Sequence, residues 1–150
     1  MLITKEIEID MGHRVLNHFS KCRNLHGHRY KIEVGVDDKL VDTKGASDEG
    51  MVIDFGDLKQ IMMNEIDSIY DHNAVFYNLD PILDFLDEYQ NEGSQSKKII
   101  EVPFIPTAEN LAKHWYELVK PKLLEKGIKI NHVKVWETPT STALYREEIM

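Results

Sequence analysis

The stretch CRNLHGHRYKIEV, residues 22–34, places the only cysteine of the chain shortly before two histidines separated by a single glycine. From Tyr30 onward, apolar side chains alternate with polar ones, which predicts a β-strand with one covered face. His26 and His28 fall on the same face as Tyr30, because side chains two residues apart in a strand point the same way. The stretch therefore predicts a strand whose covered face begins with two imidazoles.

A second alternating stretch, at the start of the chain, adds a third imidazole. Ile7, Ile9 and Met11 share one face of this predicted strand, and His13 continues that face. Since His13 ends the first strand and His26 begins the next, antiparallel pairing would bring all three histidines to one end of a sheet.

Three imidazoles at the rim of a core are costly to protonate and hard to satisfy one by one, so the cluster predicts a metal site. Three nitrogen ligands without a group of thiolates favour zinc, and a three-ligand site leaves one position open, which is typical of catalysis. The expected ligands are His13, His26 and His28. His18, in the loop between the two strands, is a weaker candidate.

Cys22 lies four residues before His26, in the same loop. The residues alone leave three interpretations open: a fourth zinc ligand that closes a structural site, an inert buried side chain, or a reactive thiol. We favour the reactive thiol, because a nearby metal and the flanking Lys21 and Arg23 would stabilise a thiolate.

Asp71 and His72, in the sequence YDHN, lie at the end of a helix predicted over residues 57–70. A histidine near a helix C-terminus interacts favourably with the helix dipole, which would explain it structurally. A carboxylate beside a histidine can instead orient the ring for acid–base catalysis. The residues alone do not decide between the two interpretations.

Two glutamates are further candidates for a binding role. Glu137 ends an apolar row with Val133 and Val135, so its carboxylate faces inward and needs a donor. The donor is either a structural Arg or Lys, or a ligand with two parallel N–H groups such as the edge of a pterin or guanine. Glu109 lies in the first turn of a predicted helix, where the dipole alone explains it.

The net charge of −8 argues against general nucleic-acid binding, but the charge is unevenly distributed. Residues 60–96 contain eight acidic side chains and no Lys or Arg, whereas residues 11–32 contain no acid. The basic side chains of residues 11–32 are Arg14, Lys21, Arg23, Arg29 and Lys31. Positive charge around the histidines suits a small polyanion such as a phosphorylated metabolite.

At 150 residues the chain has the length of one ordinary domain. Its single cysteine permits no internal disulfide, its charged first residues are unlike a signal peptide, and no apolar run approaches the roughly 20 residues of a membrane span. We therefore expect one cytoplasmic domain over residues 1–150 that binds neither membranes nor nucleic acid.

The rest of the pattern predicts an α+β fold, with an antiparallel sheet covered on one face by two helices. Asp54 or Gly56 would cap the helix over 57–70, and Thr107 would cap a second helix, which Pro121 should end or kink. The other expected elements are a short surface helix in PILDFLDEYQ (81–90), a loop in NEGSQS (91–96), and strands at KKIIEVP (97–103), 131–138 and 141–147.

The ordered motifs of the chain resemble those of 6-pyruvoyltetrahydropterin synthase-like proteins. They are MGHRV (11–15), CRNLHGHRY (22–30), MVIDFGDLK (51–59), DHNAVF (71–76), PTAENLA (106–112) and VWETPTSTALY (135–145). The resemblance covers nearly the whole chain except residues 80–96. The spacing Cys-x-x-x-His-Gly-His is similar to that of the carboxy-forming members, the 6-carboxy-5,6,7,8-tetrahydropterin synthases of bacterial queuosine and 7-deazaguanine biosynthesis.

This resemblance implies a tunnelling fold (T-fold), whose subunits join sheets into trimeric barrels that pair as homohexamers with sites between subunits. It implies a zinc-dependent conversion of 7,8-dihydroneopterin triphosphate to 6-carboxy-5,6,7,8-tetrahydropterin, acetaldehyde and triphosphate. His13, His26 and His28 match the zinc ligands of the family, and Cys22, Asp71 and His72 match its catalytic set. Glu137 matches the carboxylate that anchors the pterin, while Thr107 and Glu109 fall in a segment that contributes to the pterin pocket.

Two alternatives remain. A 6-pyruvoyltetrahydropterin synthase would use the same site and stop after triphosphate elimination and a redox shift in the side chain. A non-catalytic module would either hold zinc with Cys22 as a fourth ligand, or bind a pterin without converting it.

Overall fold

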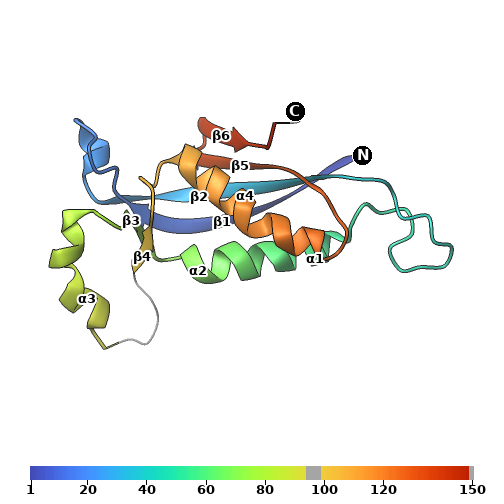
Figure 1. Ribbon diagram of the computed structural model, residues 1–150, viewed down its shortest axis with the longest axis horizontal. Coiled ribbons are helices and arrows are strands. Elements are labelled where there is room, and N and C mark those ends of the chain that lie inside the picture. Colours follow the sequence, from blue (N-terminus) through green and yellow to red (C-terminus); the bar gives the residue numbers. More distant parts are fainter. Residues whose placement is uncertain (94–98, 149–150) are drawn as a thin grey trace.

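The computed structural model describes residues 1–93 and 99–148, which form a curved mixed sheet with helices packed on one face (Figure 1). Within these residues the strand order is β4-β3-β1-β2-β5-β6. The strands are β1 Leu2–His13, β2 His26–Asp37, β3 Ala74–Tyr77, β4 Ile99–Val102, β5 Ile130–Thr138 and β6 Ser141–Tyr145.

The long antiparallel pair of β1 and β2 forms the centre of the sheet. Its register runs from Leu2 opposite Asp37 to His13 opposite His26. The alternation expected from the sequence is confirmed, since Ile7, Ile9 and Met11 are buried on the helix-covered face, as are Tyr30 and Ile32. Both histidine-bearing strand ends therefore meet at one end of the sheet.

The expectation of a wholly antiparallel sheet is wrong on one side. β3 pairs in parallel with β1, and β4 pairs in parallel with β3. β3 itself was not expected, because this four-residue strand is buried at Val75 and Phe76 without alternation. A buried strand that short carries no period-two signal.

Two helical segments cover the sheet (Figure 1). The first joins α1 Phe55–Met62, the π-helical turn η2 Met63–Asp67 and α2 Ser68–Tyr70, and the second is α4 Ala108–Leu124. The caps are Asp54, whose side chain accepts from the Gly56 N–H, and Thr107, whose hydroxyl accepts from the Asn110 N–H.

Pro121 does not end α4, contrary to expectation, and the helix continues to Leu124. A proline inside a helix removes one backbone hydrogen bond and crowds the preceding turn. Val119 and Leu123 are fully buried on either side of it, so packing against the core holds the last turn in place.

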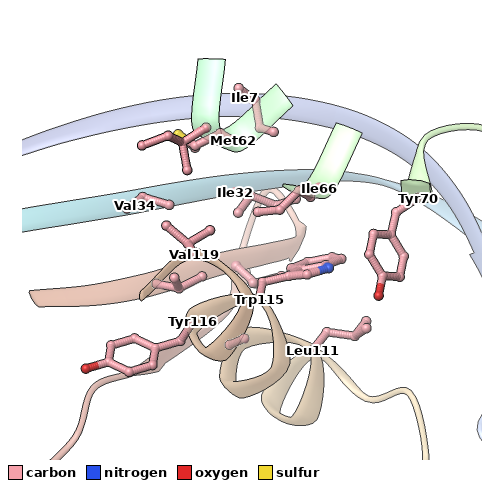
Figure 2. Packing of buried hydrophobic residues seen from close by; sticks show 14 of the residues in the cluster. Ile7, Ile32, Val34, Met62, Ile66, Tyr70, Leu111, Trp115, Tyr116 and Val119 are labelled. Carbon is pink, nitrogen blue, oxygen red and sulfur yellow. The ribbon is translucent and has the colours of Figure 1, made fainter. Parts of the chain in front are cut away.

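The core lies between these helices and the sheet. Figure 2 shows Trp115 and Val119 of α4 facing Ile32 and Val34 of β2, with Ile66 of the first helical segment beside them. Trp115 is fully buried and meets the rings of Tyr30 and Tyr70 edge-on. Because Tyr30 is also in ring contact with His13 and His28, the core continues directly into the histidine cluster.

Short helical pieces complete the chain: η1 Lys21–Arg23 between β1 and β2, then η3 Pro81–Phe85 and α3 Asp87–Asn91 in the acidic segment. The short surface helix expected over 81–90 is thus present in two parts. Residues 94–98, which include part of the expected loop 91–96 and the first two residues of the expected strand 97–103, lie outside the described residues. No helix in the described ranges is long and apolar enough to cross a membrane.

Candidate metal centre and active site

The three predicted metal ligands converge at the end of the β1–β2 pair. The Nε2 atoms of His13 and His26 are 3.1 Å apart. Together with a ring nitrogen of His28 they form a group whose candidate ligand atoms all lie within 4.8 Å of one another. His13 is buried, and His26 and His28 are partly exposed, so the group opens to solvent on one side.

Backbone carbonyls orient two of these rings. The Nδ1–H of His13 donates to the Pro106 carbonyl at 2.7 Å, and the Nδ1–H of His26 donates to the Asn24 carbonyl at 2.6 Å. With the proton on Nδ1 in both rings, the two Nε2 lone pairs face each other. Metal-bound histidines are commonly fixed by such a second hydrogen bond.

His28 completes the fit to a metal ion. Its Nε2 is buried and has no hydrogen-bond partner within the described residues. Buried polar atoms are normally satisfied, so an unpartnered nitrogen beside two converging lone pairs is the arrangement expected of a site that holds a cation. Borderline-soft Zn²⁺ suits a set of three imidazoles.

The electrostatics of the cluster favour the neutral form of two of its rings, those of His13 and His28. Burial is the main cause that lowers the pKa of both His13 and His28 below the ordinary value, and neighbouring imidazoles lower it further. The charge of Glu137 opposes both effects. A neutral imidazole is the form that binds a metal, so burial favours the ligand state at neutral pH.

Glu137 lies at the end of β5 with its Oε1 3.8 Å from Nε2 of His28. Within the described residues no Arg or Lys forms an ion pair with it, so the structural partner considered above is not found there. Its carboxylate lines a cavity of about 440 Å³, shared with His28, Arg29, Lys31 and Trp136 among others. A partly buried carboxylate without a cationic partner, facing a cavity, is suited to a ligand that donates N–H groups.

Asp71 and His72 form a second polar centre. The Nδ1 of His72 is 2.7 Å from Oδ2 of Asp71, and the other carboxylate oxygen accepts from the Asp10 N–H at 2.9 Å. The His72 N–H donates to the Asp10 carbonyl at 2.7 Å, and this holds His72 at a φ of 63°. The hydrogen bond and the charge of Asp71 raise the pKa of His72. A non-glycine residue held at positive φ marks a strained site.

Both sides of this pair are supported by Asp10, which the sequence did not single out. Its carboxylate binds the guanidinium of Arg29 through two hydrogen bonds, of 2.9 and 3.1 Å. His72, Asp10 and Arg29 line a cavity of about 670 Å³ that also reaches Gly27 and His28. The cavity therefore adjoins both the acid–base pair and the histidine cluster.

Cys22 lies in η1, is partly buried, and does not belong to the histidine group. This position disfavours the interpretation in which it closes a four-ligand structural site. Cys22 is also absent from the group that Asp71 and His72 form with Asp10, whose candidate ligand atoms lie within 4.8 Å of one another, so within the described residues one chain does not bring the three predicted catalytic side chains into one cluster. His18 also lies outside the group: its Nδ1 accepts from the Ser20 N–H and its ring stacks on Phe19.

The basic residues near the site differ in their availability. Arg14, which the charge pattern offered for a polyanion, instead pairs with the buried Asp80 at 2.9 Å. Arg29 is held by Asp10 but lines both cavities. Lys21 and Arg23 are exposed and make no ion pair in the described part of the chain.

Thr107 and Glu109 begin α4 next to the histidine cluster. Thr107 caps the helix, and the preceding Pro106 supplies the carbonyl that orients His13. Glu109 is exposed in the first turn. The carbonyls of Pro106 and Asn24 could not be found from the sequence, because any residue type supplies a carbonyl.

Comparison with known proteins places this chain in a family. The profile of the family described as 6-pyruvoyl tetrahydropterin synthase matches residues 2–148. The chain therefore belongs to the 6-pyruvoyl tetrahydropterin synthase family.

Relatives within the family carry more specific names. A protein of Rickettsia felis named 6-carboxy-5,6,7,8-tetrahydropterin synthase is 36% identical over 137 residues, which cover 91% of this chain and 93% of the relative. A protein of Haemophilus influenzae with the same name is 34% identical over 153 aligned positions, covering 97% and 98% of the two chains.

Solved structures show the same fold. An uncharacterised protein from Wolinella succinogenes superposes with a TM-score of 0.81 at 25% identity, covering 99% of this chain and 98% of its own. The 6-pyruvoyl tetrahydropterin synthase of Caenorhabditis elegans superposes with a TM-score of 0.69 at 22% identity, covering 99% and 96%. The T-fold expected from the resemblance is thereby confirmed.

Proposed function

We propose that this chain is a zinc-dependent lyase that converts 7,8-dihydroneopterin triphosphate and water to 6-carboxy-5,6,7,8-tetrahydropterin, acetaldehyde and triphosphate, within queuosine biosynthesis. The observation that carries the proposal is the convergence of three histidine nitrogens, with the Glu137 carboxylate 3.8 Å from one of them. The names of relatives at 34–36% identity support the carboxy-forming reaction.

His13, His26 and His28 would hold the metal, and the hydrogen bonds of His13 and His26 to backbone carbonyls would fix those two rings before it binds. When bound, zinc supplies Lewis-acid polarisation to oxygen atoms of the substrate side chain. The partly exposed His26 and His28 leave an open side through which the substrate can approach.

Glu137 would anchor the pterin through paired hydrogen bonds to its amidine edge, with a geometry like that of an Arg–carboxylate pair. Its closeness to His28 would place the pterin side chain beside the metal ligands. Thr107 and Glu109, next to the Pro106 carbonyl, would contribute to the same pocket.

The Asp71–His72 pair would move protons on and off the side-chain carbons of the substrate. Asp71 orients the ring and stabilises its protonated form, so that Nε2 can exchange a proton with the substrate. Cys22 as a thiolate would serve as the second acid–base group.

The separation of Cys22 from Asp71 and His72 within one chain supports an assembly in which a neighbouring copy completes the site. We propose the homohexamer of the T-fold, a dimer of trimers, in the cytoplasm. The net charge of −8 supports a small-molecule partner rather than nucleic acid.

A 6-pyruvoyltetrahydropterin synthase activity is the second candidate, since it needs the same site. The solved 6-pyruvoyl tetrahydropterin synthases of Caenorhabditis elegans and Plasmodium falciparum are 22% and 19% identical to this chain, so their likeness concerns the fold. Product chemistry separates the two activities.

The decisive experiment is mass spectrometry of the products after the zinc-loaded protein is incubated with 7,8-dihydroneopterin triphosphate. A carboxytetrahydropterin with released acetaldehyde is the expected result. A pyruvoyl product would instead support the 6-pyruvoyltetrahydropterin synthase activity. Zinc binding without turnover would support a non-catalytic binding module.

A further inference from the structure

A buried ion pair ties the acidic segment, here residues 80–91 with η3 and α3, to the residue that follows the His13 end of β1. The Nε–H of Arg14 donates to Oδ2 of Asp80 at 2.9 Å, and the Asp80 side chain is 0% exposed. The other carboxylate oxygen accepts from the Ile82 N–H at 2.9 Å, which caps η3. Both oxygens of this buried carboxylate are therefore engaged, and its one cationic partner is Arg14 within the described residues.

The pair joins two places that are distant in sequence. Arg14 directly follows His13, whereas Asp80 begins the acidic segment, 66 residues further on. In Figure 1 the α3 end of that segment and the loop after β1 lie at the same end of the sheet. A displacement of the segment would therefore be transmitted to the residue next to a metal ligand.

The same segment contributes to the larger cavity. Leu86 and Tyr89 line the space of about 670 Å³ that Arg29 and His72 also line. The exposed acids of the segment, Asp84, Asp87 and Glu88, are not part of that lining. The surface that faces the cavity is thus apolar and aromatic, and suits an uncharged part of a ligand rather than its phosphates.

We propose that residues 80–91 form a wall of the substrate cavity, and that the Arg14–Asp80 pair is a positioning element that keeps this wall in place relative to His13. The inference rests on the proposed function, which makes the cavity beside His72 a substrate site. It assigns a role to the acidic segment, which none of the motifs quoted above includes.

The test compares Arg14→Met with Arg14→Lys, which keeps the charge but not the directional guanidinium. Lys120→Met is the matched control, because it breaks an exposed ion pair to Glu147 on the surface of α4. Hydrogen exchange of residues 80–91, zinc content, substrate affinity by calorimetry, and kcat and KM are measured on each full-length protein.

Breaking a buried pair leaves an uncompensated charge, so Arg14→Met should speed hydrogen exchange across residues 80–91 by at least about 100-fold. It should lower kcat/KM by about 10- to 100-fold, mainly through KM, because the wall no longer positions the substrate. Zinc content should stay unchanged, Arg14→Lys should restore part of the loss, and Lys120→Met should match the wild type. A loosened segment with unchanged KM and affinity would overturn the proposal.

A second variant guards against misfolding of the first. Leu86→Gln changes the wall without touching the ion pair, and should raise KM while hydrogen exchange elsewhere stays unchanged. Wild-type affinity in Leu86→Gln would also overturn the proposal.

A wild-type protein that binds the substrate without converting it would instead contradict the proposed function. The substrate affinities of the variants, measured by calorimetry, would still show whether residues 80–91 form a wall of the cavity. A wild type that neither binds nor converts it would overturn both.

Discussion

His13 and His26 face each other across the β1–β2 ladder with Nε2 atoms 3.1 Å apart, while each ring gives its Nδ1 proton to a backbone carbonyl. Two lone pairs at that distance repel each other unless a cation lies between them. The fixed carbonyls prevent either ring from turning away without losing a hydrogen bond. The cluster therefore has the geometry of a site organised in advance for an ion, with His28 as the third candidate ligand.

Replacement of His28 by alanine should abolish stoichiometric zinc binding, whereas Cys22→Ala should retain it. The affinity loss for His28→Ala should exceed about 100-fold, the upper end for residues that only support a ligand. His18→Ala, a histidine outside the group, is the control. Zinc is measured by competition with a chromophoric chelator. Loss of zinc from Cys22→Ala would instead favour a four-ligand structural site.

Glu137→Gln should reduce kcat/KM by about 10- to 100-fold, because one acceptor of a charge-assisted pair becomes a donor that faces the N–H groups of the ligand. Zinc content should not change, since Glu137 is not among the expected ligands. Glu125→Gln, at the exposed end of α4, provides a control for the loss of one negative charge. Steady-state kinetics measure the effect, and a change smaller than twofold would remove Glu137 from the pterin site.

Asp71→Asn should lower the pKa of His72 toward its ordinary value of about 6.5, because the hydrogen bond and charge that raise it are weakened or removed. In the wild type the raised pKa means that the folded state binds this proton more tightly than the unfolded state. The resulting stabilisation is fully present below the ordinary pKa and is lost as the pH rises through the raised pKa.

NMR titration of a His72 ring proton in the wild type and in Asp71→Asn measures this change in the pKa of His72. If neutral His72 acts as the base, the acidic limb of the rate profile should move to lower pH in Asp71→Asn, with a smaller maximal rate. Equal titration curves for the two proteins would show that Asp71 does not control the ring. Glu65→Gln, on the first helical segment, is the matched carboxylate control.

The sequence predicted the features that depend on the alternation of apolar and polar residues within a strand. It did not predict contacts between residues that are distant in the sequence. The faces of β1 and β2, and hence the convergence of His13 with His26, follow from period-two patterns read over twelve-residue strands. The short β3 carries too few residues for such a pattern. The Arg14–Asp80 pair joins residues 66 positions apart, so charge alone assigned Arg14 to a polyanion.

Some features of the site have no sequence signal at all. The carbonyls of Pro106 and Asn24 orient the candidate ligands His13 and His26 through backbone atoms. Asp10 supports the Asp71–His72 pair through its own N–H and carbonyl. Cys22 lies outside the group that Asp71 and His72 form with Asp10, and this depends on tertiary structure.

Gly35→Ala should destabilise the protein, because a Cβ at this position would lie 2.1 Å from Cε1 of His132 on the neighbouring strand β5. The ring has little freedom to retreat, since its two nitrogens are 2.6 Å from a Glu33 oxygen and 2.7 Å from the Asn131 side chain. Overpacking of this kind typically costs about 1–3 kcal/mol. Urea unfolding at constant m-value measures the change in the free energy of unfolding.

In a His132→Ala background, Gly35→Ala should cost much less free energy of unfolding, because the clashing ring is gone and the two effects are coupled. Gly12→Ala, whose Cβ would meet its nearest neighbour at 3.4 Å, is the control. Equal costs in the two backgrounds would mean that His132 does not dictate glycine at position 35, and that the β2–β5 pairing which carries Glu137 is held by other contacts.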